Sequence, residues 1–343
     1  MNRKALTIAA ALGALAIVLA AVALWPRPDL VVYTSADSAY SLPLAQAFEK
    51  RTGLRVALVP DAESAKTTGL YQRLLAEKSR PRADVFWNSE ITRTVLLARK
   101  GVLDAYNPPA ARDLPAEFCP TSARWHGFAC RVRVIIYNQN LVKTREQAPQ
   151  SVLDLAESRW KGQAALAYPL FGTTAAHAAA LRVHLGREQA NEFFRKLVAN
   201  GAQVVNGNGI VADRVASGQA AVGLTDTDDA WTRIDDGKPL GIIYPDQGPG
   251  QMGALVIPNT AGRVAGAPHR EAAERFLDFL CSTEAEAMLA QPPARHLPTR
   301  PDKVKAAADT AALREIRSLK VDWERVADEV EIQAAELEQI FGR

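Results

Sequence analysis

The sequence predicts an α/β fold of two lobes joined by strands that cross between them. Short apolar runs alternate with segments of helical periodicity from residue 30 onward, a pattern typical of parallel sheets covered by helices. Near residue 131 a longer alternating run interrupts this series, which then resumes, and the interruption indicates a second unit. The 343 residues suffice for two lobes, and 48% hydrophobic with 23% charged residues is the composition of ordinary globular proteins.

The first part of the chain contains three strand-like runs, each followed by a helical segment. The first run is rich in β-branched residues, and the helix after it carries apolar residues at helical spacing before it stops at Gly53. The predicted strands are Leu30–Tyr33, Leu54–Val59 and Asp84–Trp87, and the predicted helices are Ser41–Arg51, Lys66–Lys78 and Ile91–Arg99. We therefore expect a parallel sheet with helices on both faces.

The second part begins with the long alternating run Arg131–Tyr137, which predicts an extended strand. The strands predicted after it are Ala164–Ala167, Gln203–Val205, Ala221–Leu224, Gly241–Tyr244 and Ala254–Ile257. The predicted helices are Thr174–Leu185, Gln189–Asn200, Ile210–Ser217, Arg270–Leu289 and most of Ala306–Phe341. We expect the runs at 131–137 and 254–257 to cross between the lobes and to flank a hinge.

The N-terminus resembles an export signal. Met1–Lys4 is basic, Ala5–Trp25 is apolar and free of acidic residues, and Ala21–Ala23 fits a small-x-small cleavage site. The apolar run is also long enough to cross a bilayer. Residues 1–26 are therefore predicted to be a signal peptide or, if retained, an anchor formed by residues 5–25. In both cases the rest of the chain is periplasmic or otherwise extracytoplasmic.

Charge and cysteine content exclude some classes of protein. With 41 Lys and Arg against 38 Asp and Glu, the net charge is only +3, so we expect no nucleic-acid partner. Three cysteines without a CxxC pair argue against a disulfide scaffold and a zinc ribbon. In an oxidising compartment Cys119 and Cys130 are either bridged or remain two small apolar residues. Cys281 is expected in the core.

The loops after the predicted strands carry many polar residues, and we expect a binding site there. Carboxylates facing one cleft prefer a cation, whereas the two helix starts at residues 172–174 and 206–209 favour an anion. We expect His177, one turn into the first of these helices, to be buried and hydrogen-bonded. The predicted ligand contacts are Ser35, Asp37, Glu63, Asn88, Glu90, Thr173, Thr174, Asn208, Asp226 and Asp228. Replacing Asp226 by Ala is expected to weaken solute binding without unfolding the protein.

No familiar catalytic motif is present in the sequence. It contains no G-x-S-x-G nucleophile elbow, no H-E-x-x-H and no P-loop. We therefore predict a binding protein and not an enzyme. An exported enzyme that uses a pair of carboxylates for acid–base chemistry remains the alternative from another class.

Several segments together resemble the extracellular solute-binding proteins of ABC importers, and among these the ferric-iron binders in particular. The segments are Val31–Ser35, Phe48–Val56, Pro81–Trp87, Arg131–Asn138, Trp160–Gly162, Gly218–Gly223, Gly253–Val256 and Ala273–Leu280. The resemblance covers nearly all of residues 29–300 and implies the type II periplasmic binding protein fold with hinge-crossing strands. It also implies a small solute, closure of two lobes around it, and delivery to a membrane permease. A monomer is expected.

The resemblance leaves the solute open. The iron binders carry adjacent tyrosines that ligate iron, but here those positions fall on Thr227 and Asp228. Ferric iron or another metal cation, carried as solute and not as a cofactor, is our first prediction. Its predicted ligands are Glu90, Asp226, Asp228 and Tyr244. A small organic cation such as thiamine or a polyamine is the second possibility and a phosphonate the third, because the loops carry few basic residues.

The lobe boundaries follow from the same reasoning. We expect residues 27–132 and 251–298 to form the first lobe, and residues 133–250 and 299–343 to form the second.

Overall fold

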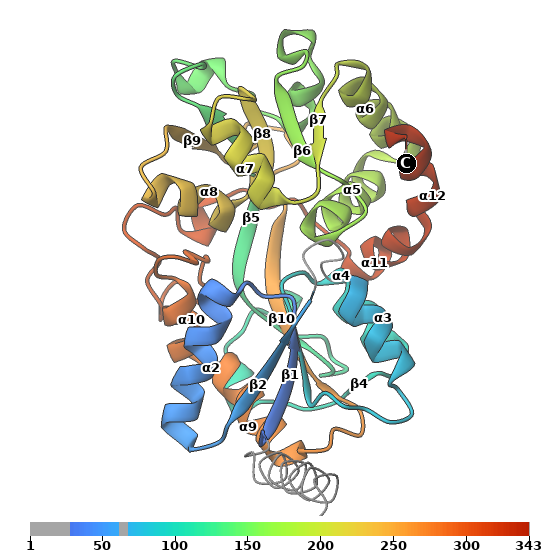
Figure 1. Ribbon diagram of the computed structural model, residues 1–343, viewed down its shortest axis with the longest axis vertical. Helices are drawn as coiled ribbons and strands as arrows, with labels where there is room; N and C mark the ends of the chain where they lie inside the picture. The colour runs from blue at the N-terminus through green and yellow to red at the C-terminus, as the bar shows by residue number, and fades with distance from the viewer. Residues whose placement is uncertain (1–27, 62–67, 343) are drawn as a thin grey trace, which may run out of the picture.

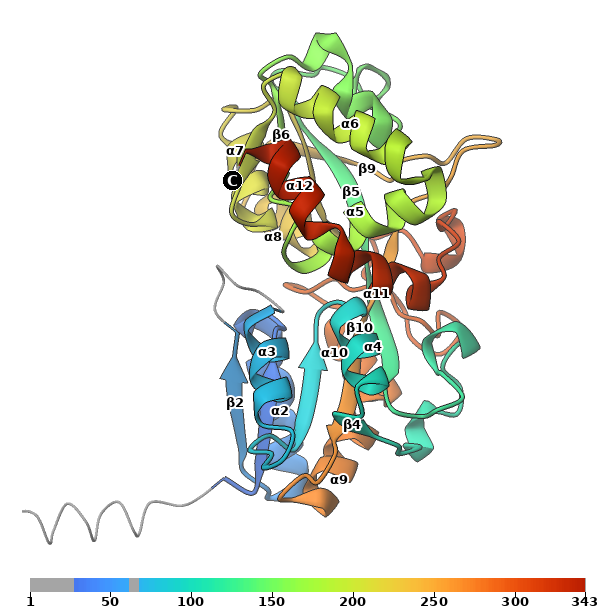
Figure 2. The ribbon, with the colours of Figure 1, turned by 90° about the vertical axis from the view of Figure 1, so that its right-hand side faces the viewer.

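A computed structural model of the chain describes residues 28–61 and 68–342. The chain forms two α/β lobes, one above the other in Figure 1, as the sequence predicts. Two long strands, β5 (His126–Asn138) and β10 (Val256–Val264), run between the lobes in both views (Figures 1 and 2). The predicted export segment, residues 1–26, lies outside the described residues. No helix among the described residues is long and apolar enough to cross a membrane.

The strands follow the order β2-β1-β3-β10-β5-β8-β6-β7, with β4 beside β10 and β9 beside β5. The lower lobe contains β1 (Leu30–Thr34), β2 (Val56–Pro60), β3 (Val85–Asn88) and β4 (Leu103–Asp104). The upper lobe contains β6 (Ala164–Ala167), β7 (Gln203–Val205), β8 (Val222–Asp226) and β9 (Leu240–Ile243). Strand β1 pairs in parallel with β2 and β3, and β6 pairs in parallel with β7 and β8. The polar carboxyl ends of these strands therefore face the space between the lobes.

Helices cover both sheets (Figures 1 and 2). Those of the lower lobe are α2 (Ser38–Thr52), α3 (Thr68–Ala76), α4 (Thr92–Arg99), α9 (Arg270–Leu280) and α10 (Thr283–Leu289). Those of the upper lobe are α5 (Gly172–Leu185), α6 (Arg187–Ala199), α7 (Asn208–Ala216) and α8 (Thr227–Asp235). Two further helices, α11 (Trp323–Ile332) and α12 (Ala334–Phe341), follow near the C-terminus. Short 3-10 helices lie at Pro109–Ala111, Ala116–Phe118, Arg145–Gln147, Val152–Ala156, Ser158–Trp160 and Leu313–Glu315.

Strand β5 joins the two sheets. Its residues from His126 to Val132 pair with β10, whereas its residues from Arg133 to Asn138 pair with β8 and β9. All of β5 is buried. The change of partner between residues 132 and 133 places two arginines, Arg131 and Arg133, at the junction of the lobes.

The structure corrects the predicted C-terminal helices. The predicted helix at 270–289 is two helices, because the Ser282 hydroxyl caps a new start by accepting a hydrogen bond from the Ala285 amide. Most of residues 299–322 are not helical, although a long helix was predicted from residue 306. Backbone pairing explains this difference, since Ala254 exchanges hydrogen bonds with Arg317 and Leu319 at 2.9 Å. Long-range pairing here outweighs local helical propensity.

All three cysteines are free. Cys119 packs against the apolar cluster of the lower lobe that contains the fully buried Cys281, whereas Cys130 belongs to a different cluster. The bridge between Cys119 and Cys130 is therefore not formed in this structure, and the prediction that Cys281 lies in the core is confirmed.

Candidate functional site

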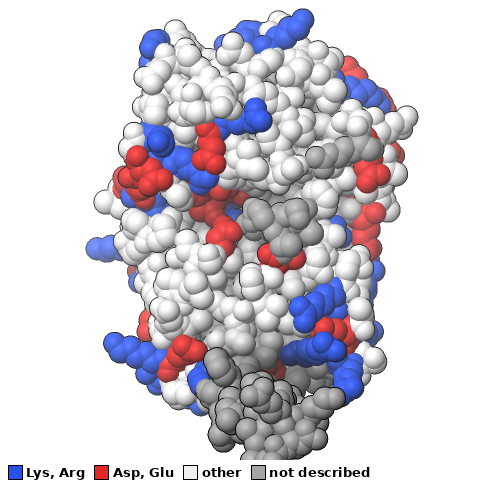
Figure 3. Space-filling model, in the orientation of Figure 1, with Lys and Arg blue, Asp and Glu red and all other residues white. Residues whose placement is uncertain are grey.

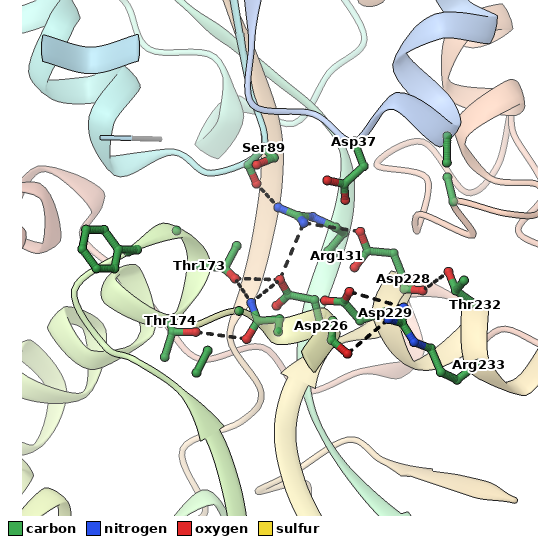
Figure 4. Close-up of a pocket in the computed structure, with 18 of the residues that line it drawn as sticks. Asp37, Ser89, Arg131, Thr173, Thr174, Asp226, Asp228, Asp229, Thr232 and Arg233 are labelled. Carbon is green, nitrogen blue, oxygen red and sulfur yellow. Dashed lines mark hydrogen bonds and ion pairs between the residues drawn. The ribbon is translucent and has the colours of Figure 1, made fainter. Parts of the chain in front are cut away.

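A cavity of about 320 Å³ lies between the lobes. Figure 3 shows acidic side chains gathered in the hollow at mid-height of the molecule, and Figure 4 shows the labelled residues of the cavity. The lower lobe contributes Asp37, Ala39, Tyr40, Ser89, Pro293 and Ala294 to its lining. Arg131 of β5 also lines it, together with upper-lobe residues that include Thr173, Thr174, Asn208, Asp226, Asp228, Asp229 and Arg233. The carboxyl ends of the strands thus hold a polar cavity, as the fold class predicts.

Three carboxylates converge where β8 gives way to α8. Asp226 ends the strand, and Asp228 and Asp229 lie in the first turn of the helix, where the helix dipole favours negative charge. One oxygen from each of the three side chains lies within 4.8 Å of the others. Carboxylate oxygens at this spacing are suitable ligands for a hard cation.

Asp226 is already held by hydrogen bonds on the upper lobe. Its carboxylate accepts from Arg133 Nη1 at 2.8 Å, from the Thr173 hydroxyl at 2.6 Å and from Asn208 Nδ2 at 3.2 Å. The Thr174 hydroxyl in turn donates to Asn208 Oδ1 at 3.1 Å. Asp226 therefore holds together the starts of α5 and α7, the two helix N-termini predicted to favour an anion.

Arg131 crosses the middle of the cavity (Figure 4). Its Nη1 lies 3.4 Å from an oxygen of Asp228 and 3.6 Å from one of Asp226, and its Nη2 donates to the Ser89 carbonyl. Burial opposes the charge of Arg131, but Asp228 and Asp226 outweigh this effect and raise the pKa of the guanidinium. Arg131 and Arg133 were not predicted as site residues. The sequence feature that could have identified them is a pair of arginines, two residues apart, in an otherwise apolar strand.

Two histidines lie beside these charges. Burial and the neighbouring Arg133 hold the pKa of His177 well below its usual value, and its Nδ1 accepts from Arg133 Nε at 3.4 Å. His177 is thus buried and hydrogen-bonded, as predicted. His296 Nε2 lies 3.7 Å from Asp228, and burial lowers the pKa of this imidazole although Asp228 opposes the shift. Both rings are therefore neutral at pH 7.

The predicted contacts Ser35, Asn88 and Glu90 form a buried network and are not among the residues that line the cavity. The Ser35 hydroxyl donates to Asn88 Oδ1 at 2.6 Å, and Asn88 Nδ2 donates to Glu90 at 3.2 Å. Glu90 also accepts from the amides of Thr92 and Arg93 at the start of α4. In this arrangement Glu90 acts as a helix cap.

Tyr244, a predicted metal ligand, also lies away from the cavity lining. It packs with Ala311 and Leu313 at the edge of an apolar cluster that surrounds β5, and burial raises its pKa to about 12. Glu63 lies outside the described residues. Of the ten predicted contacts, those that line the cavity are Asp37, Thr173, Thr174, Asn208, Asp226 and Asp228.

Two lobes that enclose a polar cavity at a crossing-strand hinge define a solute-binding protein. Residues 91–329 match the bacterial extracellular solute-binding protein family, and the chain belongs to this family. The resemblance noted in the sequence is therefore confirmed.

Curated relatives differ in the solute that their names give. The chain is 27% identical over 275 residues to iron uptake protein A1 of a Synechocystis species, a match that covers 77% of this chain and 74% of the relative. It is also 27% identical over 317 residues to a putative 2-aminoethylphosphonate-binding periplasmic protein of Salmonella paratyphi A, with 88% and 89% covered. One relative is thus named for iron uptake and the other for binding a phosphonate.

Solved structures share the fold. Iron-bound HitA from Pseudomonas aeruginosa has a TM-score of 0.80 at 24% identity, and AfuA from Actinobacillus pleuropneumoniae, with fructose-6-phosphate bound, has 0.80 at 21%. Each match covers 92% of this chain and 99% of the other. One architecture thus serves both a metal and a phosphorylated organic solute.

Proposed function

We propose that this protein captures a hard metal cation, with ferric iron first, between its lobes and delivers it to the membrane permease of an ABC importer. The convergence of Asp226, Asp228 and Asp229 in the cavity carries this proposal. Relatives named for iron uptake and ferric binding support it. We also propose that the protein binds its solute without catalysis and acts as a monomer. After export the signal peptide is cleaved, or residues 5–25 are retained as an anchor.

The three carboxylates would not contribute equally. Asp226 is held by Arg133, Thr173 and Asn208, so withdrawing an oxygen for a metal would leave buried donors without their acceptor. We infer that Asp228 and Asp229 supply the main ligands, with Asp37 closing over them from the lower lobe. The cavity of about 320 Å³ also has room for a companion anion at the starts of α5 and α7.

A second solute is favoured by one specific observation. Arg131 lies among the carboxylates, so the cavity presents both signs of charge. A zwitterion such as 2-aminoethylphosphonate suits this arrangement, with its amine at Asp228 and Asp229 and its phosphonate at a basic group. The name of the relative from Salmonella agrees with this alternative.

Closure of the lobes is the proposed mechanism of capture. We propose that the lobes comprise residues 27–132 with 251–298 and residues 133–250 with 299–343, because β5 changes partner between residues 132 and 133. The final helix α12 packs on α6 of the upper lobe, which agrees with this division. Helix α11 touches both α5 and α4 and so spans the boundary.

Solute binding by the exported form of the protein tests this proposal. Native mass spectrometry and calorimetry with ferric salts, divalent metals, thiamine, polyamines and 2-aminoethylphosphonate should show a single solute per chain. We expect Asp228→Asn to weaken binding of a ferric salt about tenfold or more, since one ligand charge is lost. Asp302→Asn, whose side chain is 93% exposed, is the control and should leave binding unchanged. Binding of thiamine or a polyamine alone, or equal affinity in both variants, would contradict the metal assignment.

A further inference from the structure

We propose that Tyr40 and Arg131 bind an oxyanion of the solute, so that the cavity takes a cation and an oxyanion side by side. This inference rests on the proposed function and deepens it, because it names the chemical class of the solute. The proposed subsite belongs to the lower lobe and the crossing strand β5. It is therefore separate from the starts of α5 and α7 on the upper lobe.

The Tyr40 hydroxyl is the first observation. Tyr40 lies in the first turn of α2, lines the cavity and is only 5% exposed. Its hydroxyl is buried and has no hydrogen-bond partner within residues 28–61 and 68–342. A buried polar group without a partner costs about 1–3 kcal/mol, so such groups are rare unless something else satisfies them.

Arg131 supplies the second observation. It lines the same cavity at 3% exposure, and its Nε is also a buried donor without a partner among the described residues. Its two terminal nitrogens are engaged by Ser89 and by the carboxylates of Asp226 and Asp228. At least the Nε–H of this permanent cation thus remains for an acceptor that is not part of the described protein.

The chemistry of these two donors selects the ligand. The Tyr40 phenol is a hydrogen-bond donor, and the Arg131 guanidinium is a donor that carries a permanent positive charge. The His296 ring packs edge-on against the Tyr40 ring, with centroids 4.8 Å apart. Its Nε2 lies 3.7 Å from an oxygen of Asp228. Two donors, one of them cationic, suit a carboxylate or phosphonate oxygen. Asp228 lies beside Arg131 and so places the cationic part of the solute next to that oxyanion.

Two kinds of solute share this chemistry. One is a metal ion chelated by an organic carboxylate such as citrate, and the other is an aminoalkyl phosphonate. Both present an oxyanion directly beside a positive charge, whereas a bare metal ion or a protonated polyamine offers Tyr40 no acceptor.

The test is Tyr40→Phe, which removes one oxygen atom. We expect the ligand-free variant to melt at or above the wild-type temperature, because the lost hydroxyl had no partner. Calorimetry with ferric citrate and with 2-aminoethylphosphonate should show about tenfold weaker binding of whichever is the solute. The matched control is Tyr33→Phe in the same lobe, whose hydroxyl donates to Glu77 at 2.9 Å, and solute affinity should not change in it.

Several results would overturn the inference. Equal affinity of wild type and Tyr40→Phe for the solute would remove the subsite but leave the proposed function intact. A melting temperature several degrees lower in ligand-free Tyr40→Phe would show that the hydroxyl has a structural partner. A visible charge-transfer band that is lost in Tyr40→Phe would mean that the phenolate ligates iron directly. If wild type binds none of the ferric salts, ferric citrate or 2-aminoethylphosphonate, this inference and the proposed function both fail.

Discussion

Asp226 and Arg133 form the most deeply buried charge pair of the cavity. Their side chains are 2% and 0% exposed, and their closest atoms are 2.8 Å apart. Removing one partner of such a pair leaves a buried charge without compensation, which is more damaging than removing both. The structure therefore changes the expectation that Asp226→Ala would spare the fold, because this carboxylate supports the architecture as well as facing the cavity.

Asp226→Ala is now expected to destabilise the protein by about 3–5 kcal/mol, since Arg133 loses its counter-charge. Urea denaturation followed by circular dichroism measures this loss. The double variant Asp226→Ala with Arg133→Met should recover much of the stability, while solute binding stays impaired. If the unfolding midpoint of Asp226→Ala lies at the same urea concentration as that of the wild type, the pair of Asp226 and Arg133 has no structural role.

At the scale of elements, close packing of α7 on β8 sets the position of Asn208. A Cβ atom on Gly223 of β8 would lie 2.7 Å from Val211 Cγ1 and 2.9 Å from Val215 Cγ2 of α7. Only glycine allows this approach. The start of α7 carries Asn208, which hydrogen-bonds Asp226, so this packing reaches the cavity.

We expect Gly223→Ala to cost about 1–3 kcal/mol through overpacking. It should also weaken solute binding, because α7 must move away from β8. Thermal melting and calorimetry measure the two effects. Val211→Ala in the Gly223→Ala background removes the nearer clash and should restore part of both, because the contact with Val215 Cγ2 at 2.9 Å remains. Unchanged melting in Gly223→Ala would show that α7 shifts without cost.

The sequence located most of these elements because strand runs and helix starts are local signals. The run at 203–205 was predicted with its observed bounds, whereas β5 extends five residues further toward the N-terminus than its alternating pattern indicated. Helix α8 was not predicted, because its acidic first turn was interpreted as a loop. The candidate site shows the same difference between residues with a local sequence signal and residues placed by tertiary structure. Loop residues such as Asp228 were found from strand ends, but Arg131 reaches the cavity only through the tertiary crossing of β5.

For the whole molecule, α11 connects the lobes outside the crossing strands. On the upper lobe it is fixed by the buried pair of Arg182 and Glu329, at 2.7 Å. Toward the lower lobe it makes exposed ion pairs, with Asp328 accepting from Arg99 at 2.6 Å and Glu331 lying 3.1 Å from Lys100. Its Ala327 also packs in the apolar cluster of the lower lobe with Val95 and Leu96, so the helix rests on both lobes and the exposed pairs bias the angle between them.

The double variant Arg99→Gln with Lys100→Gln should shift the balance between lobe arrangements. Exposed pairs are each worth about 0.2–1 kcal/mol, so loss of the two pairs should lower the population of the observed arrangement about twofold to thirtyfold. Distance distributions between labels on the two lobes of the ligand-free protein measure this shift, and solute affinity should change by a comparable factor.

The matched control is Arg195→Gln, which breaks an exposed pair with Glu188 within the upper lobe and should leave the inter-lobe distances unchanged. High salt should reproduce the effect of the double variant in the wild type, because it screens the same exposed charges. Identical distance distributions in wild type and double variant would show that these ion pairs do not set the lobe angle. In that case they contribute to stability and not to the capture of the solute.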